Sequence, residues 1–198
     1  MAKISWNGGA LLAPVPPTMV TCGSLENPNV FTVAWTGILN TKPPRTYIAV
    51  RPTRYSYDLI QNSGEFVINL TTENLVKAAD TCGVVSGRNT NKFEKCGLTP
   101  APATKVSAPL LAESPLSLEC KVRDVIEMET HHLFLADIVA VTVNEELVDG
   151  DGKLHLDKAN LAAYAHGEYF ALGKKLGKFG YSVQKKKRKP KKKASKKG

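Results

Sequence analysis

The sequence lacks the features that mark a membrane, secreted or metal-binding protein. None of its apolar runs approaches the length of a membrane span, and ALLAPVPP near the start is too short and too proline-broken for the core of a signal peptide. The four cysteines form no CxxC pair and no cluster with metal-ligand spacing. We therefore expect a cytoplasmic protein with reduced thiols and no metal site.

Two further ligand motifs are missing. No G-x-G-x-x-G segment is present, so a Rossmann nucleotide site is not expected. The segment DGDGKLHLD, starting at Asp149, begins like a calcium loop, but its fifth position is Lys153 and the position that requires glycine is Leu154. We interpret this segment as a Gly-rich turn.

Positive charge is concentrated at the C-terminal end. The formal net charge is +9, and residues 185–198 alone carry nine lysines and Arg188, which leaves 9 − 10 = −1 for residues 1–184. We predict one domain over residues 1–184 and a disordered Lys-rich tail over residues 185–198, because so charged a segment cannot build a core. Counterion release would favour contact of the tail with a polyanion or an anionic membrane surface. A solvated extension without a role is the alternative.

Strand-like runs dominate the chain, separated by proline, glycine and asparagine clusters. They cover residues 18–24, 29–35, 46–50, 65–70, 117–128 and 132–143. The last two runs predict an antiparallel hairpin that turns around Glu129 and Thr130. Residues 99–116, rich in proline and alanine, are expected to cross the surface. Many consecutive strands with few helices favour a mainly β protein, a β-barrel with helical additions, over a parallel βαβ sheet.

Three short helices are predicted between the strands. The first has Ser56 as its N-cap and stops at Gly64, and the second begins near Thr72 and ends at Gly83. A third is expected from Asp157 through KANLAAYA. The helix after Ser56 matters most, because a helix N-terminus favours an anion.

Three polar segments suggest a ligand site. VRPTRYSYDLI, residues 50–60, leads into the first helix and supplies Arg51 and Arg54, whose guanidinium groups suit a phosphate. CGVVSGRNTNKF, residues 82–93, is a Gly-punctuated loop with several polar side chains, and NVFTVAWTG, residues 29–37, is a strand-like run with polar interruptions. A solvated loop, or an ordinary core strand, is the alternative for each segment taken alone.

The order of five motifs resembles the flavin reductase-like family, of the flavoredoxin type. These motifs are FTVAWTG, VRPTRYSYDLI followed by GEFVINL, CGVVSGRNTNKF, HHLFLADIVAV and YFALGKKLGKFGY. The similarity runs from about Pro14 to about Tyr181. The resemblance implies an FMN-binding split β-barrel with a few short helices, and a homodimer that holds FMN near the subunit interface.

The same resemblance implies roles for individual residues. The isoalloxazine ring would lie along the FTVAWTG strand, and a cluster of cationic and hydroxyl side chains would surround the phosphate. His131 would be the catalytic histidine near the cofactor, and His166 and Tyr169 would reach the flavin edge. The predicted cofactor-binding residues are Thr32, Val33, Ala34, Trp35 and Thr36 for the ring, and Arg51, Arg54, Ser56, Ser86 and Lys92 for the phosphate.

Two redox functions and one binding function stay open at this stage. In the first, NADH or NADPH reduces bound FMN, and electrons leave to a flavin, a ferric complex or a protein acceptor. In the second, an FMN-bearing electron-transfer protein has no nicotinamide site of its own and is reduced by a redox partner protein. The third is a nucleic-acid-binding module led by the Lys-rich tail, against which the near-neutral body argues.

Overall fold

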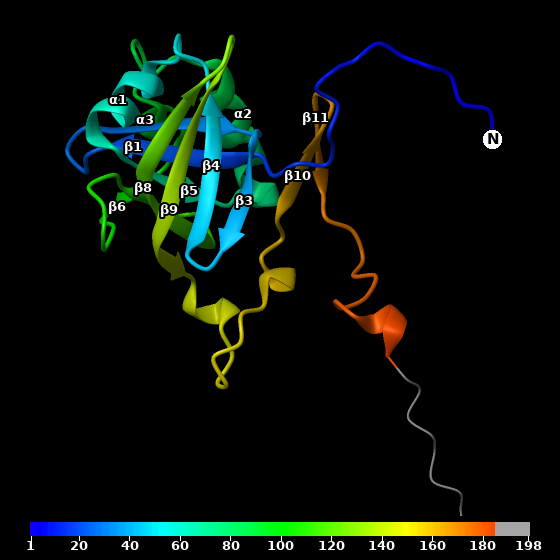
Figure 1. The fold of residues 1–198 in the computed structure, drawn as a ribbon. Coiled ribbons are helices and arrows are strands. Elements are labelled where there is room, and N and C mark those ends of the chain that lie inside the picture. The colour runs from blue at the N-terminus through cyan, green and yellow to red at the C-terminus, as the bar shows by residue number, and fades with distance from the viewer. Residues whose placement is uncertain (185–198) are drawn as a thin grey trace, which may run out of the picture.

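The computed structural model describes residues 1–184, so the predicted Lys-rich tail lies outside the described residues. The fold is mainly β, with seven antiparallel strands in the order β2-β1-β5-β8-β9-β4-β3 (Figure 1). The strands are β1 (Thr18–Gly23), β2 (Pro28–Val33), β3 (Thr36–Thr41), β4 (Pro44–Val50), β5 (Glu65–Asn69), β8 (Leu116–Glu127) and β9 (His132–Val143). The predicted mainly β class and the predicted β8–β9 hairpin are confirmed.

A two-residue link shows that this sheet is closed into a barrel. β2 and β3 are the two outermost strands in the order, yet only Ala34 and Trp35 separate them in sequence. A flat sheet would place them six strand spacings apart, roughly 29 Å, whereas three Cα steps span at most about 11 Å. The sheet must therefore curl until its edges meet. The Ala49 N–H, which donates to the Trp35 carbonyl at 2.9 Å, ties the link to β4.

The prediction of one continuous strand over residues 29–35 was therefore wrong at its end, and β3 was missed. The strand stops at Val33 because the chain must cross from one edge of the sheet to the other. Ala34 and Trp35 are apolar and give no turn signal.

The first predicted helix is confirmed as α1 (Tyr55–Ser63), but its predicted N-cap is wrong. Arg54 occupies the N-cap position, and Ser56 lies inside the helix, where its buried Oγ accepts a hydrogen bond from Asn29 Nδ2 at 2.8 Å. The C-terminal stop is as predicted, since Gly64 adopts φ 67°, the left-handed conformation that glycine tolerates best. Ser56 thus fastens α1 to β2.

The second predicted helix consists of a 3₁₀ turn, η1 (Glu73–Leu75), followed by α2 (Val76–Val84). The predicted third helix is wrong: a short turn, η3 (Leu156–Lys158), leads into β10 (Ala162–Ala165), which pairs with β11 (Glu168–Ala171). Sequence reasoning also missed α3 (Lys92–Cys96), η2 (Glu145–Leu147) and η4 (Tyr181–Val183). No helix within residues 1–184 is both long and apolar enough to cross a membrane.

The expectation that residues 99–116 merely cross the surface is also wrong in part. β6 (Pro100–Ala101) pairs with β7 (Leu110–Leu111), and Ala108 and both residues of β7 are buried. This segment covers β5 and β8, so it contributes to the core.

Apolar side chains are buried in two main clusters on the two sides of β1 and β2. The barrel interior contains Phe66, Phe134 and Ile48, together with Ile60 from α1. The outer cluster packs α2 and α3 against the barrel through Met19, Val30, Ala79, Cys82 and Phe93. Both helices are therefore held against β2.

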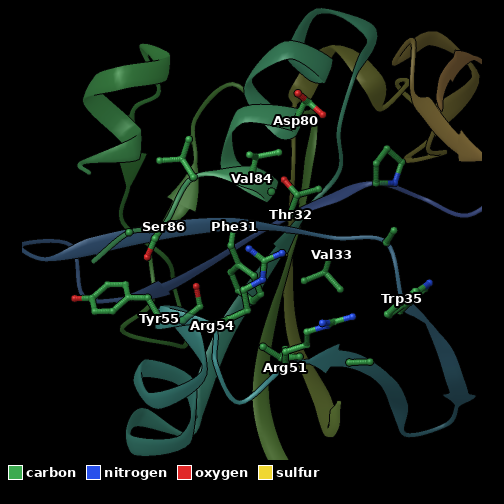
Figure 2. Close-up of a pocket in the computed structure, with 18 of the residues that line it drawn as sticks. Phe31, Thr32, Val33, Trp35, Arg51, Arg54, Tyr55, Asp80, Val84 and Ser86 are labelled. Atoms are coloured by element: carbon green, nitrogen blue, oxygen red, sulfur yellow. The ribbon is translucent and has the colours of Figure 1, made fainter. Parts of the chain in front are cut away.

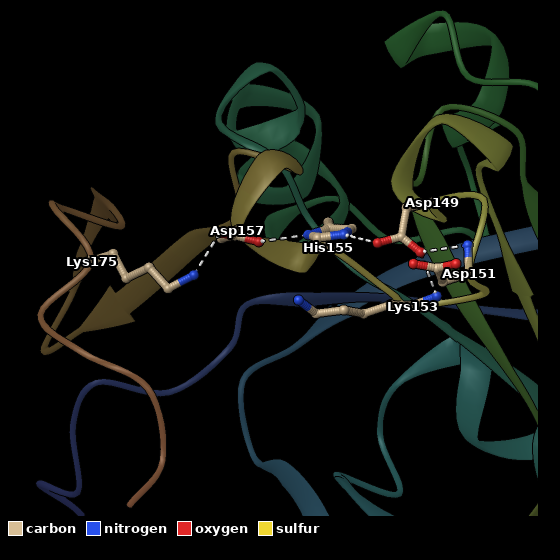
Figure 3. A network of polar contacts seen from close by, with 6 residues as sticks. All are labelled: Asp149, Asp151, Lys153, His155, Asp157 and Lys175. Atoms are coloured by element: carbon tan, nitrogen blue, oxygen red, sulfur yellow. Dashed lines mark hydrogen bonds and ion pairs between the residues drawn. The ribbon is translucent and has the colours of Figure 1, made fainter. Parts of the chain in front are cut away.

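The segment that begins at Asp149 is a turn, as predicted. The Asp149 Oδ1 accepts the backbone N–H groups of Asp151 at 3.1 Å and Lys153 at 2.9 Å, and Gly152 has φ 77°. Oδ2 accepts a hydrogen bond from His155 Nε2 at 2.7 Å (Figure 3). The hydrogen bond from His155, with those from the backbone, lowers the pKa of Asp149 to about 2. Both carboxylate oxygens are thus used within the turn.

This turn is connected to the C-terminal segment by charge (Figure 3). His155 Nδ1 lies 3.9 Å from an oxygen of Asp157, and Asp157 accepts a hydrogen bond from Lys175 Nζ at 2.8 Å. The contacts are exposed, and each is worth little by itself. Together they hold the chain on either side of the β10–β11 hairpin.

A buried carboxylate in β8 generates the first prediction. Glu119 is fully buried, and its oxygens accept hydrogen bonds from Thr104 N and Oγ1, and from Lys105 N at 2.6 Å. Burial by itself would raise the pKa of Glu119, but the hydrogen bonds from Thr104 and Lys105 outweigh it and lower the pKa below 4.5. The ionised carboxylate therefore stabilises the folded chain.

We expect Glu119→Gln to lower the free energy of unfolding by about 1–3 kcal/mol at pH 7, because an amide N–H would face backbone donors. The pKa of Glu119 is lower in the folded chain than in the unfolded chain. The loss of unfolding free energy should therefore be largest above the unfolded-state pKa, and it should shrink as the pH falls through the folded-state pKa. Urea unfolding across that range measures it. Glu113→Gln, at an exposed glutamate that accepts Thr99 N at 3.2 Å, is the control. A loss of unfolding free energy in Glu119→Gln that does not change with pH would contradict this account.

Candidate active site

A cavity of about 640 Å³ opens where the two edges of the barrel meet. Its wall comes from the β2–β3 link, the loop between β4 and α1, the end of α2 with the following loop, and the β10–β11 hairpin (Figure 2). We call this cavity the seam pocket. The closure of the barrel, together with the packing of α2 on β2, creates it.

Three cations line one part of the seam pocket, namely Arg51, Arg54 and Lys92. Within residues 1–184 none of them forms an ion pair. Asp80 is the one carboxylate in the lining that the structure describes, and Figure 2 shows it across the view from Arg51. The pocket therefore has a cationic part that no carboxylate of the described chain neutralises.

Lys92 is unusual because its side chain is almost fully buried, at 4% exposure. Its Nζ donates to the carbonyl oxygen of Cys82 at 3.0 Å, the one hydrogen bond it makes to residues 1–184. Burial lowers the pKa of Lys92, and the nearby Arg54 lowers it further. An ammonium group with one acceptor and two more donors can bind an anion in the pocket.

The loop after α2 approaches α1 closely at Gly87. A Cβ at this position would lie 2.1 Å from Asn29 Oδ1 and 2.9 Å from a ring carbon of Tyr55, so a side chain cannot fit. The close contact places Ser86 in the pocket wall, where its Oγ accepts Arg88 N at 3.2 Å. Ser86 thus lies beside the cationic part.

The β2–β3 link offers free backbone donors. The Val33 carbonyl accepts from Thr18 Oγ1, and the Trp35 carbonyl accepts from Ala49 N. The N–H groups of Ala34 and Trp35 find no acceptor in the described chain. Since both residues line the pocket, these N–H groups can bind the polar edge of a ligand.

His131 lies at the pocket wall immediately before β9. Arg51 Nε donates to its Nε2 at 3.4 Å, and its ring packs edge-on against Trp35 at 4.6 Å. Burial, followed by the charges of Arg51 and Arg54, lowers the pKa of His131. The imidazole is therefore neutral at pH 7. Because its Nε2 accepts from Arg51, its proton belongs on Nδ1, which lies 3.0 Å from Thr130 Oγ1. In this state His131 orients the Arg51 guanidinium.

The β10–β11 hairpin closes the other part of the pocket. Tyr169 lines it and donates to Asp80 Oδ1 at 3.2 Å. Burial, followed by Asp80, raises the pKa of Tyr169 to about 12. His166 belongs to the tight turn with φ 50° and does not line the pocket. His132 is likewise outside, because its Nδ1 lies 2.9 Å from the Tyr57 hydroxyl.

The structure brings the predicted site residues together with two exceptions, Thr36 and His166. All the others line the seam pocket, whereas Thr36 Oγ1 donates to the Tyr47 carbonyl within the β3–β4 pair and His166 lies in the β10–β11 turn. Ser56 reaches the wall with its hydroxyl already bonded to Asn29. That these residues hold FMN stays a prediction.

Sequence reasoning missed several residues of the wall, including Phe31, Asp80 and Tyr55. Tyr55 stands in the quoted VRPTRYSYDLI segment and could have been included. Asp80 had no such signal, because the helix on which it lies was predicted from its apolar positions alone.

Comparison with known proteins agrees with this architecture. The family described as "Flavin reductase like domain" matches residues 11–173. The fold is similar to that of flavoredoxin of Desulfovibrio vulgaris (Miyazaki F), with a TM-score of 0.85. The two sequences are 32% identical, and the match covers 92% of this chain and 100% of that one.

Two further structures share the fold. A putative flavin reductase with split barrel domain from Shewanella frigidimarina has a TM-score of 0.76 at 23% identity, covering 85% of this chain and 86% of that one. An FMN-binding protein from Thermus thermophilus has a TM-score of 0.71 at 23% identity, covering 86% and 93%. The closed sheet described above is thus a flavin reductase-like split barrel, and the chain belongs to the flavin reductase-like domain family.

Proposed function

We propose that this chain is an oxidoreductase that binds FMN in the seam pocket and passes electrons from NADH or NADPH to a flavin, a ferric complex or a protein acceptor. The observation that carries the proposal is the cationic part of the pocket, where Arg51, Arg54 and buried Lys92 have no carboxylate partner among residues 1–184. A terminal phosphate would supply the missing negative charge. FMN, when bound, would supply the electron-transfer chemistry.

The remaining wall suits the rest of such a ligand. The free N–H groups of Ala34 and Trp35 would hydrogen-bond the polar edge of the ring, and Trp35 would shield one side from water. The volume of about 640 Å³ lies within the range of small-molecule and cofactor sites. The relative from Thermus thermophilus, which shares the fold, is an FMN-binding protein by its description.

In this proposal His131 is the predicted histidine beside the cofactor, and it acts by orienting Arg51. Because its Nε2 accepts from Arg51 Nε, a neutral imidazole fixes the direction of the guanidinium. Protonation would remove that acceptor and place a third positive charge beside Arg51 and Arg54. The lowered pKa of His131 keeps this orientation intact at neutral pH.

An FMN-bearing electron-transfer protein without a nicotinamide site is the second candidate. It is favoured by the sequence, which contains no glycine-rich dinucleotide motif. Rapid mixing of the FMN-loaded chain with NADH or NADPH separates the two candidates. Bleaching of the flavin absorbance at a saturable rate supports the oxidoreductase, whereas no bleaching with either donor supports the carrier.

We further propose a homodimer in the cytoplasm. Large apolar side chains are exposed on β3 and β9 and next to the pocket at Trp35, and the N-terminal segment extends away from the barrel (Figure 1). Such a surface marks an interface, and a second copy would cover it. The exposed apolar residues include Ile4, Trp6, Ile38, Leu39, Val139, Val141, Leu176 and Phe179. The four cysteines are free, as a reducing compartment requires.

The phosphate assignment predicts a selective loss of affinity. Arg51→Ala and Arg54→Ala should each weaken FMN binding by about 1.5–3 kcal/mol, because each removes a charged hydrogen bond. Riboflavin, which has no phosphate, should bind both variants almost as it binds the unchanged chain. Quenching of flavin fluorescence gives both affinities. Arg123→Ala is the control, since Arg123 is exposed and pairs with Asp137 at 3.4 Å. Equal losses for riboflavin and FMN would remove the phosphate from this part of the pocket.

The dimer predicts that charge on β3 disrupts assembly. We expect the unchanged chain to sediment as a dimer and Ile38→Glu to shift it towards monomer, because a carboxylate would be buried without a partner. Leu25→Glu, in the exposed β1–β2 turn, should leave assembly unchanged. A chain that sediments as a monomer at micromolar concentration refutes the assembly and leaves FMN binding to be judged by its own measurement.

The Lys-rich tail stays a prediction from charge. We propose that it contacts polyanions or an anionic membrane surface, with affinity that falls steeply as salt rises. Truncation after Gln184 should abolish binding to a heparin column while leaving FMN content unchanged. Loss of FMN on truncation would show that the tail belongs to the site.

A further inference from the structure

Two cysteines pack in the same apolar cluster behind the cationic part of the seam pocket. Cys82 is a fully buried residue of α2, within the apolar cluster that packs both helices on the barrel. Cys96 is the last residue of α3, only partly buried, and packs against the same cluster. Both side chains contribute to one cluster, and Cys96 is among the groups that raise the pKa of Cys82, so the two cysteines are near neighbours. Cys22 and Cys120 lie in the separate barrel core.

Lys92 connects this thiol pair to the pocket. Lys92 and Cys96 are four residues apart on α3, so their side chains project from the same helix face. Lys92 Nζ donates to the carbonyl of Cys82 itself at 3.0 Å, which places that face of α3 over Cys82. Both Lys92 and Gly83, the neighbour of Cys82, line the pocket. The two thiols therefore lie directly behind the wall that carries the buried ammonium group.

The surroundings of the two thiols differ. Burial, followed by the charge of Cys96, raises the pKa of Cys82 to about 12, so Cys82 is a neutral thiol at physiological pH. A buried neutral thiol reacts slowly with an oxidant in solution. Cys96 is the more accessible of the two and would react first.

We propose that Cys82 and Cys96 form a reversible disulfide that tethers α3 to α2 and fixes Lys92 in the pocket wall. With hydrogen peroxide as oxidant, the Cys96 sulfur takes one oxygen, giving a sulfenic acid and one water. The Cys82 sulfur then attacks the Cys96 sulfur, the S–O bond breaks, and the leaving hydroxide takes the Cys82 thiol proton as a second water. The two sulfurs lose two electrons, peroxide gains them, and a dithiol reductant reverses the change.

The tether would act on an anion bound in the pocket. In the reduced chain, α3 has five residues and its Lys92 side chain is held by one hydrogen bond. A covalent link one turn away restricts that side chain before the ligand arrives. This consequence rests on the proposed FMN function, whereas the disulfide itself does not.

Peptide mapping of the full chain tests the disulfide without added flavin. After treatment with hydrogen peroxide and blocking of remaining thiols in denaturant, we expect one linked peptide pair containing Cys82 and Cys96, two blocked cysteines, and reversal by dithiothreitol. Cys96→Ser should give no linked pair. Cys120→Ala, which removes a cysteine of the barrel core, should leave the linked pair in place. Oxidation of Cys96 to a sulfinic acid without a linked pair, or links that involve Cys22 or Cys120, would overturn the proposal.

Release of FMN tests the consequence on the same samples. Fluorescence recovery should show that FMN dissociates roughly two- to tenfold more slowly from the oxidised chain than from the reduced one, the range expected for one side chain immobilised in advance. Peroxide should not change the rate for Cys96→Ser. An unchanged rate in the linked chain overturns the action on Lys92. A chain that forms the linked pair but binds no FMN overturns the proposed function and leaves the disulfide established.

Discussion

The two-residue link between Val33 and Thr36 is the constraint on which the rest of the structure depends. Because it joins the two edge strands, the sheet has to close, and the end of β2 comes to lie beside the end of β4. The β4–β9 register pairs Val50 with His132, so Arg51 and His131 follow from neighbouring strand ends and meet. The pocket lies at this seam, and its free N–H groups belong to the link itself.

Helices α2 and α3 complete the site, at a cost to stability. Among the residues that the structure describes, the Lys92 ammonium is buried against a single carbonyl and has no counter-charge, and such burial is unfavourable without a ligand. An anion in the pocket would offset that cost, so ligand binding and stability are coupled at this residue. The same packing of α3 over α2 brings Cys96 to Cys82, which makes the environment of Lys92 sensitive to the state of the thiols.

The strands of the barrel could be predicted because their apolar runs end at proline, glycine and asparagine clusters. The link could not, since Ala34 and Trp35 are as apolar as the strand before them, and only the pairing of distant strands ends β2 there. The helix expected after Asp157 failed for a related reason. Asn160 takes a positive φ of 49° that breaks the helix, and β10 instead gains a hydrogen-bonded partner in β11.

The site was less accessible from local pattern than the fold. The polar loops around Arg51 and Lys92 could equally well be solvated surface. Only the order of the motifs, which resembles that of the flavin reductase-like family, indicated that both loops belong to one site. Net charge also concealed the site, because residues 1–184 sum to 9 − 10 = −1 although the pocket is locally cationic. The local excess of positive charge arises only because barrel closure brings the loop with Arg51 and Arg54 to the pocket, and because helix packing buries Lys92 beside it. Burial and convergence are properties of the closed fold, so no window of the sequence contains them.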